Sequence, residues 1–214
     1  MKKIFTAIVA LMLAVPSFAQ FASGGFELEK KNLYYGARMG LSMGMMSGDI
    51  DATGMKAGLN LAGVIGLRVS EKSPVFLESG LYYTQRGGKK DDYTMNLKYL
   101  EVPIVIKYGI KATDDIALLP FIGPYFAFGV GGDLEYEEAV KDPVTNTTTI
   151  VKNKEGVYER FLNRKDMGFK LGCGMEYNML YLEVAYQLGV TNIADDDDYS
   201  IHANQLSINF GVNF

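Results

Sequence analysis

The sequence is poor in the residues that build several common kinds of site. One cysteine and one histidine in 214 residues exclude an internal disulfide and a cysteine-rich zinc site. Tryptophan is absent, and six prolines are too few for collagen-like or proline-rich sequence. The formal charge of −4 argues against a nucleic acid partner, because phosphate backbones bind basic surfaces. No run of 18 apolar residues occurs, so no transmembrane helix is expected in the mature protein.

The first 19 residues have the pattern of a cleaved secretory signal peptide. Lys2 and Lys3 form a positive start, and an apolar stretch follows over residues 4–15. Ser17 and Ala19 place small residues at the two positions that define a cleavage site. The pattern predicts export and a cut after Ala19, which leaves residues 20–32 as a periplasmic N-terminal segment.

From residue 33 onward, apolar residues recur at every second position, which is the period of a β-strand. Leu33 and Tyr35, for example, alternate with Tyr34 and Gly36, and no helical period occurs in this part of the chain. Eight strands of about ten residues predict an all-β fold, an eight-stranded antiparallel up-and-down transmembrane β-barrel over residues 33–214. The alternating segments lie at residues 33–44, 58–69, 75–86, 100–109, 122–131, 167–176, 180–189 and 205–214.

The connections between these segments alternate in length. Every odd connection is long and polar, whereas every even one is short, as in outer-membrane barrels with outer loops and periplasmic turns. Both ends of the barrel segment then lie in the periplasm, and the third outer connection is expected to extend its hairpin beyond the membrane. The long connections are residues 47–55, 87–93, 132–164 and 192–203, and the short ones are residues 71–73, residues 112–115 and a turn near Asn178.

The polar face of the strands is rich in glycine, with charged residues set singly between the glycines. A soluble barrel with an apolar lumen, such as a ligand carrier, would need the opposite face inside and a denser charged exterior. A membrane barrel places the polar face in the lumen, where balanced charges form ion pairs. The predicted lumen network consists of five cations and five acids: Arg38, Arg68, Arg86, Lys107 and Lys170, with Glu78, Glu101, Asp166, Glu176 and Glu183.

Aromatic residues are found near the ends of the predicted strands and in the last strand. Tyrosines near strand ends are typical of the girdles at membrane interfaces, and the last strand carries Phe210, Val212 and the terminal Phe214. This end resembles the insertion signal that barrel-assembly machinery reads in outer-membrane proteins. The tyrosines interpreted as girdle residues are Tyr34, Tyr35, Tyr82, Tyr83, Tyr177 and Tyr181.

The segment Tyr-Leu-Glu-Val-Pro-Ile-Val-Ile-Lys-Tyr at residues 99–108 resembles the signature fourth strand of PorT-like outer-membrane barrel proteins. The Gly123-Pro124-Tyr125 run fits the strand that follows it there. In strand number and order the resemblance extends over the mature chain, and it is shared with small barrels of the OmpX and OmpA type. It implies a role in a secretion apparatus that spans the periplasm, and it brings no catalytic or ligand residues.

Few residues are candidates for catalysis or for metal binding. His202 could pair with Ser200 or Ser207 and an acid in a lipid-hydrolysing site, although no Gly-x-Ser-x-Gly elbow is present. The four consecutive acids from Asp195 to Asp198 could bind calcium, but their contiguous spacing differs from that of an EF-hand loop, and a solvated acidic loop is favoured. Cys173 has the lipid-facing parity and is interpreted as an inert apolar residue.

The sequence therefore predicts a non-enzymatic outer-membrane barrel with no catalytic residue, metal or cofactor, because eight strands enclose only enough space for side chains. It would act as a scaffold through its third and fourth outer loops or through residues 20–32 and the turns. The expected partners are outer-membrane lipid and lipopolysaccharide, the barrel-assembly machinery, and periplasmic or secretion-machinery proteins. A small lipid-modifying enzyme using His202, and a stand-alone adhesion or binding barrel, are the alternatives.

Overall fold

The computed structural model describes residues 32–49, 54–70, 72–90, 93–141, 148–159, 162–195 and 198–214. The predicted signal peptide and nearly all of the predicted N-terminal segment lie outside these residues. No helix in the described ranges is long and apolar enough to cross a membrane.

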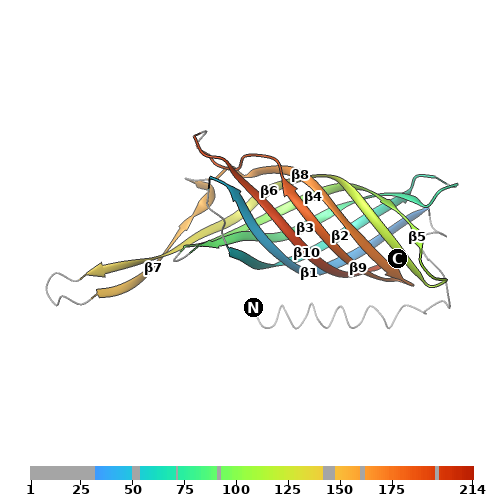
Figure 1. Cartoon of the computed structure of the whole chain (residues 1–214), viewed down its shortest axis with the longest axis horizontal. Helices are drawn as coiled ribbons and strands as arrows, with labels where there is room; N and C mark the ends of the chain where they lie inside the picture. Colours follow the sequence, from blue (N-terminus) through green and yellow to red (C-terminus); the bar gives the residue numbers. More distant parts are fainter. Residues whose placement is uncertain are drawn as a thin grey trace.

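Ten strands and one short 3-10 turn make up the described chain (Figure 1). Eight of the strands form the barrel, while β5 and β7 pair only with parts of β6. Their bounds are β1 (Leu33–Gly48), β2 (Gly54–Arg68), β3 (Val75–Lys90), β4 (Tyr93–Tyr108), β5 (Ile110–Lys111), β6 (Ile116–Lys141), β7 (Thr148–Gly156), η3 (Val157–Glu159), β8 (Lys165–Tyr177), β9 (Leu180–Gly189) and β10 (Ile201–Asn213).

The sheet closes on itself, which confirms the predicted eight-stranded antiparallel barrel. Neighbours in sequence pair in the order β4-β3-β2-β1-β10-β9-β8-β6, and β4 pairs with β6 to complete the circle. Closure leaves the barrel without an edge strand, so every strand has a hydrogen-bonding partner on both sides. The short connection between β8 and β9 is a tight turn in which Asn178 has a positive φ of 53°, a conformation that asparagine tolerates well.

Several strands are longer than the period-two pattern predicts. The second outer connection was expected to span residues 87–93, but β3 continues to Lys90 and β4 begins at Tyr93. The third outer connection contains a continuation of β6 paired with β7, from Asp133 opposite Gly156 to Lys141 opposite Thr148. This hairpin projects from one end of the barrel (Figure 1). The apolar pattern ends where both faces of a strand meet water, so the pattern marks the part in the membrane and not the whole strand.

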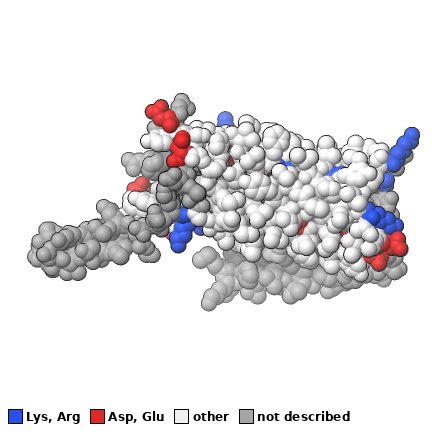
Figure 2. Space-filling view, viewed as in Figure 1, with Lys and Arg blue, Asp and Glu red and all other residues white. Residues whose placement is uncertain are grey.

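The outer surface carries the apolar half of the alternation. Leu33 is 50% exposed and Tyr35 62%, whereas Tyr34 between them is fully buried. On the face shown in Figure 2 the middle of the barrel is almost entirely white, with only small areas of charged atoms, and Lys, Arg, Asp and Glu side chains gather near its two ends. This arrangement is the reverse of a soluble barrel and suits a lipid environment, which rules out the interpretation as a soluble carrier with an apolar lumen.

The tyrosines divide by parity, which corrects the prediction that six of them form girdles. Tyr35 and Tyr177 point outward as expected, and Tyr83 shares the outward face of β3 with Leu81, but Tyr34, Tyr82 and Tyr181 are buried in the lumen. Closeness to a strand end was the wrong criterion, because adjacent residues of a strand face opposite sides whatever their height in the membrane.

Glycines next to these rings give them room. A Cβ at Gly66 would collide with the ring of Tyr34, and one at Gly174 would collide with the ring of Tyr181. In each case the ring lies over the bare backbone of a glycine, so the narrow lumen can hold large side chains.

A cluster of buried apolar side chains lies at the end of the barrel that carries the long connections, which we call the outer end, and we call this cluster the apolar plug. It joins inward-facing strand residues to residues of the outer connections, and a β-bridge between Leu162 and Ala194 ties two of these connections together. A plug of this kind was not predicted, because its loop residues follow no period. Its members are Met46, Leu97, Tyr99, Tyr125, Ala127, Val157, Leu162, Ile193, Ala194, Ile201 and Ala203.

The last residue completes the seam between the first and last strands. The backbone N–H of Phe214 donates to the carbonyl of Tyr35 at 2.7 Å, and the N–H of Tyr35 donates to Phe214 at 3.3 Å. The two rings stack with centroids 5.9 Å apart.

We predict that deleting Phe214 reduces the amount of folded barrel in the outer membrane, because it removes this ring pair, one pair of seam hydrogen bonds and the predicted insertion signal. The measurement compares unboiled and boiled samples of membrane fractions by gel mobility. Substitution of Phe214 by tyrosine keeps a terminal aromatic ring and should preserve folding. Wild-type amounts of folded protein after the deletion would contradict the prediction.

Candidate functional site

The lumen holds the buried charged side chains of the described structure. Antiparallel pairing brings inward positions of all eight barrel strands around one axis, so the charges spaced along the sequence meet there. Nine of the ten predicted network residues are 2% exposed or less. The tenth, Arg68, is half-buried at the turn end, where its Nε donates to the carbonyl of Ser70 at 2.9 Å. The buried nine are Arg38, Glu78, Arg86, Glu101, Lys107, Asp166, Lys170, Glu176 and Glu183.

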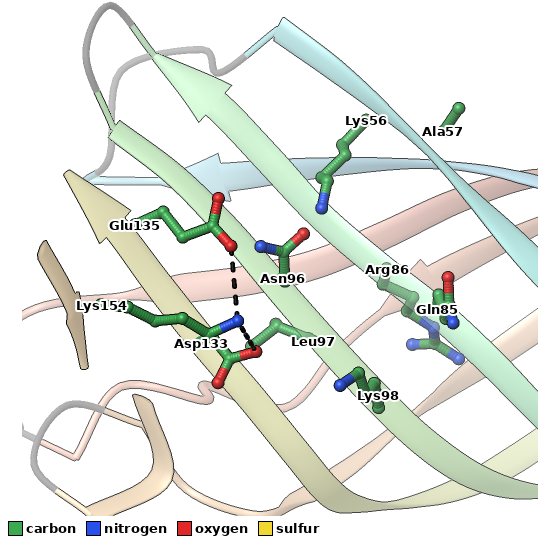
Figure 3. A pocket seen from close by; sticks show the side chains of 10 residues that line it. All are labelled: Lys56, Ala57, Gln85, Arg86, Asn96, Leu97, Lys98, Asp133, Glu135 and Lys154. Atoms are coloured by element: carbon green, nitrogen blue, oxygen red, sulfur yellow. Dashed lines mark hydrogen bonds and ion pairs between the residues drawn. The ribbon is translucent and has the colours of Figure 1, made fainter. Parts of the chain in front are cut away.

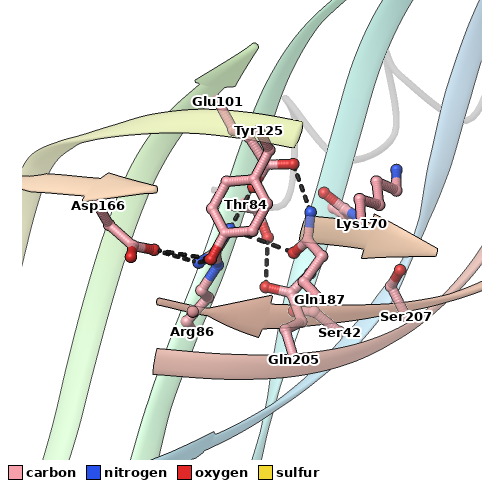
Figure 4. A network of polar contacts seen from close by, with 12 residues as sticks. Ser42, Thr84, Arg86, Glu101, Tyr125, Asp166, Lys170, Gln187, Gln205 and Ser207 are labelled. Carbon is pink, nitrogen blue, oxygen red and sulfur yellow. Dashed lines mark hydrogen bonds and ion pairs between the residues drawn. The ribbon is translucent and has the colours of Figure 1, made fainter. Parts of the chain in front are cut away.

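Arg86 of β3 is the centre of the cluster nearest the apolar plug (Figure 4). One of its terminal nitrogens lies 2.7 Å from Asp166 of β8, and the other contacts Glu101 of β4. The second nitrogen also donates to Gln187 of β9 at 3.1 Å. Tyr125 of β6 completes the group by donating to Asp166 at 3.1 Å. One guanidinium thus joins two carboxylates and an amide from three other strands, an arrangement that its planar set of donors favours.

A second cluster lies around two lysines. Lys107 Nζ is 2.8 Å from Glu78 and donates to the hydroxyl of Tyr181 at 2.7 Å. Lys170 Nζ is 3.1 Å from Glu183 and lies 4.2 Å from the ring centre of Tyr82. Each buried ammonium therefore has a carboxylate partner and an aromatic neighbour, which offsets part of the cost of removing it from water.

A third cluster lies toward the turn end and the chain terminus. Arg38 donates to the side chain of Asn213 at 2.5 Å, and Asn213 in turn donates to Glu176 at 2.7 Å. Arg38 also lies 3.6 Å from Glu78 and 4.0 Å from the ring centre of Tyr181. Arg38 therefore links the lysine cluster to the last residues of β10.

Neutral polar residues are the part of this network that charge counting missed. Some amides at inward positions contact a charged group, as Asn209 does by donating to Glu183 at 3.2 Å, and other amides and hydroxyls contact one another, as Thr84 does by donating to Gln205 at 3.0 Å. The signal that would have found them is inward parity alone, because each falls on the same face as the charged residues. The set comprises Asn60, Thr84, Gln187, Gln205, Asn209 and Asn213.

The three clusters and the apolar plug occupy the lumen at different heights. A water-filled pathway needs an interior wider than an eight-stranded barrel provides, and here the interior holds paired charges and rings. The arrangement stabilises the barrel and closes it. Within the described residues, no three His, Cys, Asp or Glu side chains come together in a group that could bind a metal ion.

The remaining candidate residues lie away from these clusters. Cys173 is exposed on the outward face. Asp196 and Asp197 fall outside the described residues, so the acidic run as a calcium site stays an untested interpretation.

His202 contacts Ser200, as the interpretation of a lipid-hydrolysing site requires. Its Nδ1 lies 3.1 Å from the carbonyl of Thr191, and its Nε2 lies 3.1 Å from Ser200 Oγ. Because a carbonyl only accepts, Nδ1 carries the hydrogen, and Nε2 of a neutral ring then accepts from the serine hydroxyl. The third position, which an acid fills in a hydrolase triad, is occupied by this backbone carbonyl.

Comparison with known proteins identifies the family. The profile described as outer membrane protein beta-barrel domain matches residues 18–195. The chain belongs to this family. It is accordingly an outer-membrane β-barrel protein, in agreement with the closed barrel and its apolar outer band. No curated protein matches the chain significantly.

Several solved outer-membrane barrels match the chain at low sequence identity. The attachment invasion locus protein Ail of Yersinia pestis is 10% identical, with 86% of this chain and all of that chain covered, at a TM-score of 0.46. Neisserial surface protein A is 12% identical over 86% and 98% of the two chains, with a TM-score of 0.47. The outer membrane protease OmpT of Escherichia coli is 8% identical over 86% and 96%, with a TM-score of 0.45.

The central position of Arg86 makes it the sharpest test of the lumen network. We predict that Arg86→Ala lowers the free energy of unfolding by about 3–5 kcal/mol, because it leaves two buried carboxylates without their cation. The measurement is urea unfolding of the barrel in lipid vesicles.

A matched control is Lys111→Ala, which removes an ion pair with Asp114 of 3.3 Å at exposed side chains. Exposed pairs contribute roughly 0–1 kcal/mol, so this variant should unfold nearly as the wild type does. Equal losses in the two variants would show that the lumen charges do not hold the barrel together.

Proposed function

We propose that this protein is a closed, non-enzymatic membrane anchor that holds a binding surface at the outer face of the outer membrane. The observation that carries the proposal is the filled lumen, because a barrel plugged by paired charges offers neither a channel nor an internal ligand cavity. The parts left to act are the outer hairpins and the periplasmic turns. The resemblance to PorT-like proteins supports the narrower proposal that the partner belongs to a secretion apparatus.

The hairpin of β6 and β7 is the favoured docking element. In the described chain β7 pairs only with β6, and β6 pairs with β4 only as far as Tyr136. Beyond that point, among the residues that the structure describes, no strand pairs with the outer edge of β6 or of β7. Such edges are suited to bind a partner's extended segment by β-strand addition.

The test is the native size of the full protein in mild-detergent extracts of outer membranes, for the wild type and for a variant with a shortened hairpin. In the variant, residues 137–152 are replaced by Asn-Gly, so that the turn joins Tyr136 to Asn153, which are paired in the wild type. We expect the wild type to migrate in a complex far larger than one chain and the variant to migrate as a monomer.

The shortened variant must still show different mobility in unboiled and boiled samples, which demonstrates a folded barrel. A wild-type protein that migrates alone would contradict the anchor proposal. A complex of unchanged size in the variant would contradict the hairpin as its docking element and leave the turns as the contact surface.

The contact between Ser200 and His202 favours a second candidate function, a lipid-hydrolysing enzyme at the outer rim. The tautomer deduced for His202 is the one that a general base for the serine hydroxyl requires. The carbonyl of Thr191 can orient the ring but supplies no negative charge to stabilise an imidazolium, unlike the buried acid of a hydrolase triad.

We predict that His202→Ala leaves lipid hydrolysis by the purified barrel at the background level of the wild type. The assay follows fatty acid release from phospholipid and from lipopolysaccharide in mixed micelles, with Ser200→Ala as the matched variant. Hydrolysis by the wild type that both substitutions abolish would replace the anchor proposal with the enzymatic one.

A further inference from the structure

A polar pocket lies near the outer end of the barrel, across β2, β3, β4, β6 and β7. Its volume is about 240 Å³. Figure 3 shows three lysines, Lys56, Lys98 and Lys154, and two acids, Asp133 and Glu135, in its lining. These five side chains come from four strands, so the pocket depends on the folded barrel.

The charges in this pocket are not evenly matched. Lys154 Nζ lies 3.0 Å from Asp133 and 3.5 Å from Glu135, so one lysine is shared between both acids. The hydrogen bond to Asp133 raises the pKa of Lys154 and keeps it charged. No ion pair joins Lys56 or Lys98 to an acid anywhere in the described ranges. Among the described residues the pocket lining therefore holds three lysines against two acids, an excess of one positive charge.

Lys56 is held in an unfavourable place for a cation. Its partial burial lowers its pKa, and the charges of Lys98 and Lys154 act in the same direction, against the attraction of Glu135 and Asp133. Its stem passes close to Gly87, where a Cβ would lie 3.2 Å from Lys56 Cδ. The regular pairing of β2 with β3 is interrupted between Met55 and Asn60, next to this lysine. A bound anion would relieve the repulsion, since opposite charges at contact distance attract more strongly where water is partly excluded.

The height of the pocket on the barrel indicates what kind of anion it meets. Leu100 and Val102 face outward on β4 and are exposed, and the next outward position toward the outer end is Lys98. On β6 the apolar residue Phe128 also faces outward and is exposed. Farther toward the outer end, beyond a β-bulge in the pairing of β4 with β6, lies Asp133, which pairs with Asn96. The pocket thus lies where the apolar band gives way to polar side chains. In a bilayer this boundary is the headgroup region, where phosphate groups lie.

We propose that Lys56 and Lys98 form a binding site for a phosphate monoester at the outer rim of the barrel. Lysine binds phosphate as a compact positive charge with three donors. The two lysines belong to different strands, β2 and β4, and both line the pocket. This chemistry is supplied by a membrane lipid headgroup or by a soluble sugar phosphate. The site is independent of the hairpin docking proposed above.

The experiment uses the full folded protein in an uncharged detergent and two probes. Phosphatidic acid, compared with phosphatidylcholine, is counted on the barrel by native mass spectrometry, and glucose 1-phosphate is titrated by calorimetry. We expect saturable binding that the double variant Lys56→Gln with Lys98→Gln weakens at least about tenfold, as loss of charge-assisted hydrogen bonds does. Binding of the lipid alone assigns the site to headgroups, and binding of both assigns it to the phosphate group itself.

Two variants serve as matched controls. Lys165→Gln removes an exposed lysine at the start of β8, at the same end of the barrel but outside the pocket lining, and should bind as the wild type does. Glu135→Gln removes a negative charge from the pocket and should strengthen binding.

The proposal is overturned if neither probe binds, if the double variant binds as the wild type does, or if Lys165→Gln weakens binding equally. If the double variant does not fold, Lys98→Gln is compared with Lys98→Arg. Weaker binding in the glutamine variant and retained binding in the arginine variant would then support the site, and equal binding in both would overturn it.

Discussion

The lipid around the barrel is the constraint on which the rest of this structure depends. Hydrocarbon provides no hydrogen bonds and no counterions, so the strands must close into a ring and every charged group at membrane depth must point inward. Alternation then places Leu33 and Tyr35 outside and Tyr34 inside. Once charges are confined to a narrow lumen they must pair, because an isolated buried charge is costly. The three clusters around Arg86, the two lysines and Arg38 follow from this confinement.

The same constraint explains why much of the fold is readable from the sequence. A strand with one face in lipid and one in a polar lumen has a strict period of two, and the charged residues on the polar face identify the interior. Arg86, Glu101 and Asp166 can be assigned to the lumen on parity alone. Parity gives the face of a residue but not its height, which depends on the stagger between strands. The joining of these three residues in one cluster could therefore not be predicted from the sequence.

The period-two alternation could not predict several other features, and each has a physical reason. The apolar plug contains Leu162 and Ile193, which come from connections that have no repeating period. The extensions of β3, β4 and β6 lie beyond the membrane, where no lipid imposes alternation. Tyr34 and Tyr181 look like girdle residues because tyrosine suits both an interface and a polar lumen. The pocket near Lys56 lies beside an interruption in the pairing of β2 with β3. No residue type in this part of the sequence indicates that interruption.

The seam between β1 and β10 determines when a newly exported chain can fold. The ring is completed by pairs such as Gly36 with Asn213, which join the beginning of the barrel sequence to its end. No partial chain can form this contact, so an incomplete ring would expose two open strand edges together with the apolar outer band. Contacts between such distant residues form slowly, and unfolded chains with these features aggregate. The newly exported polypeptide therefore needs to be kept apart from its own copies until its final strand is available.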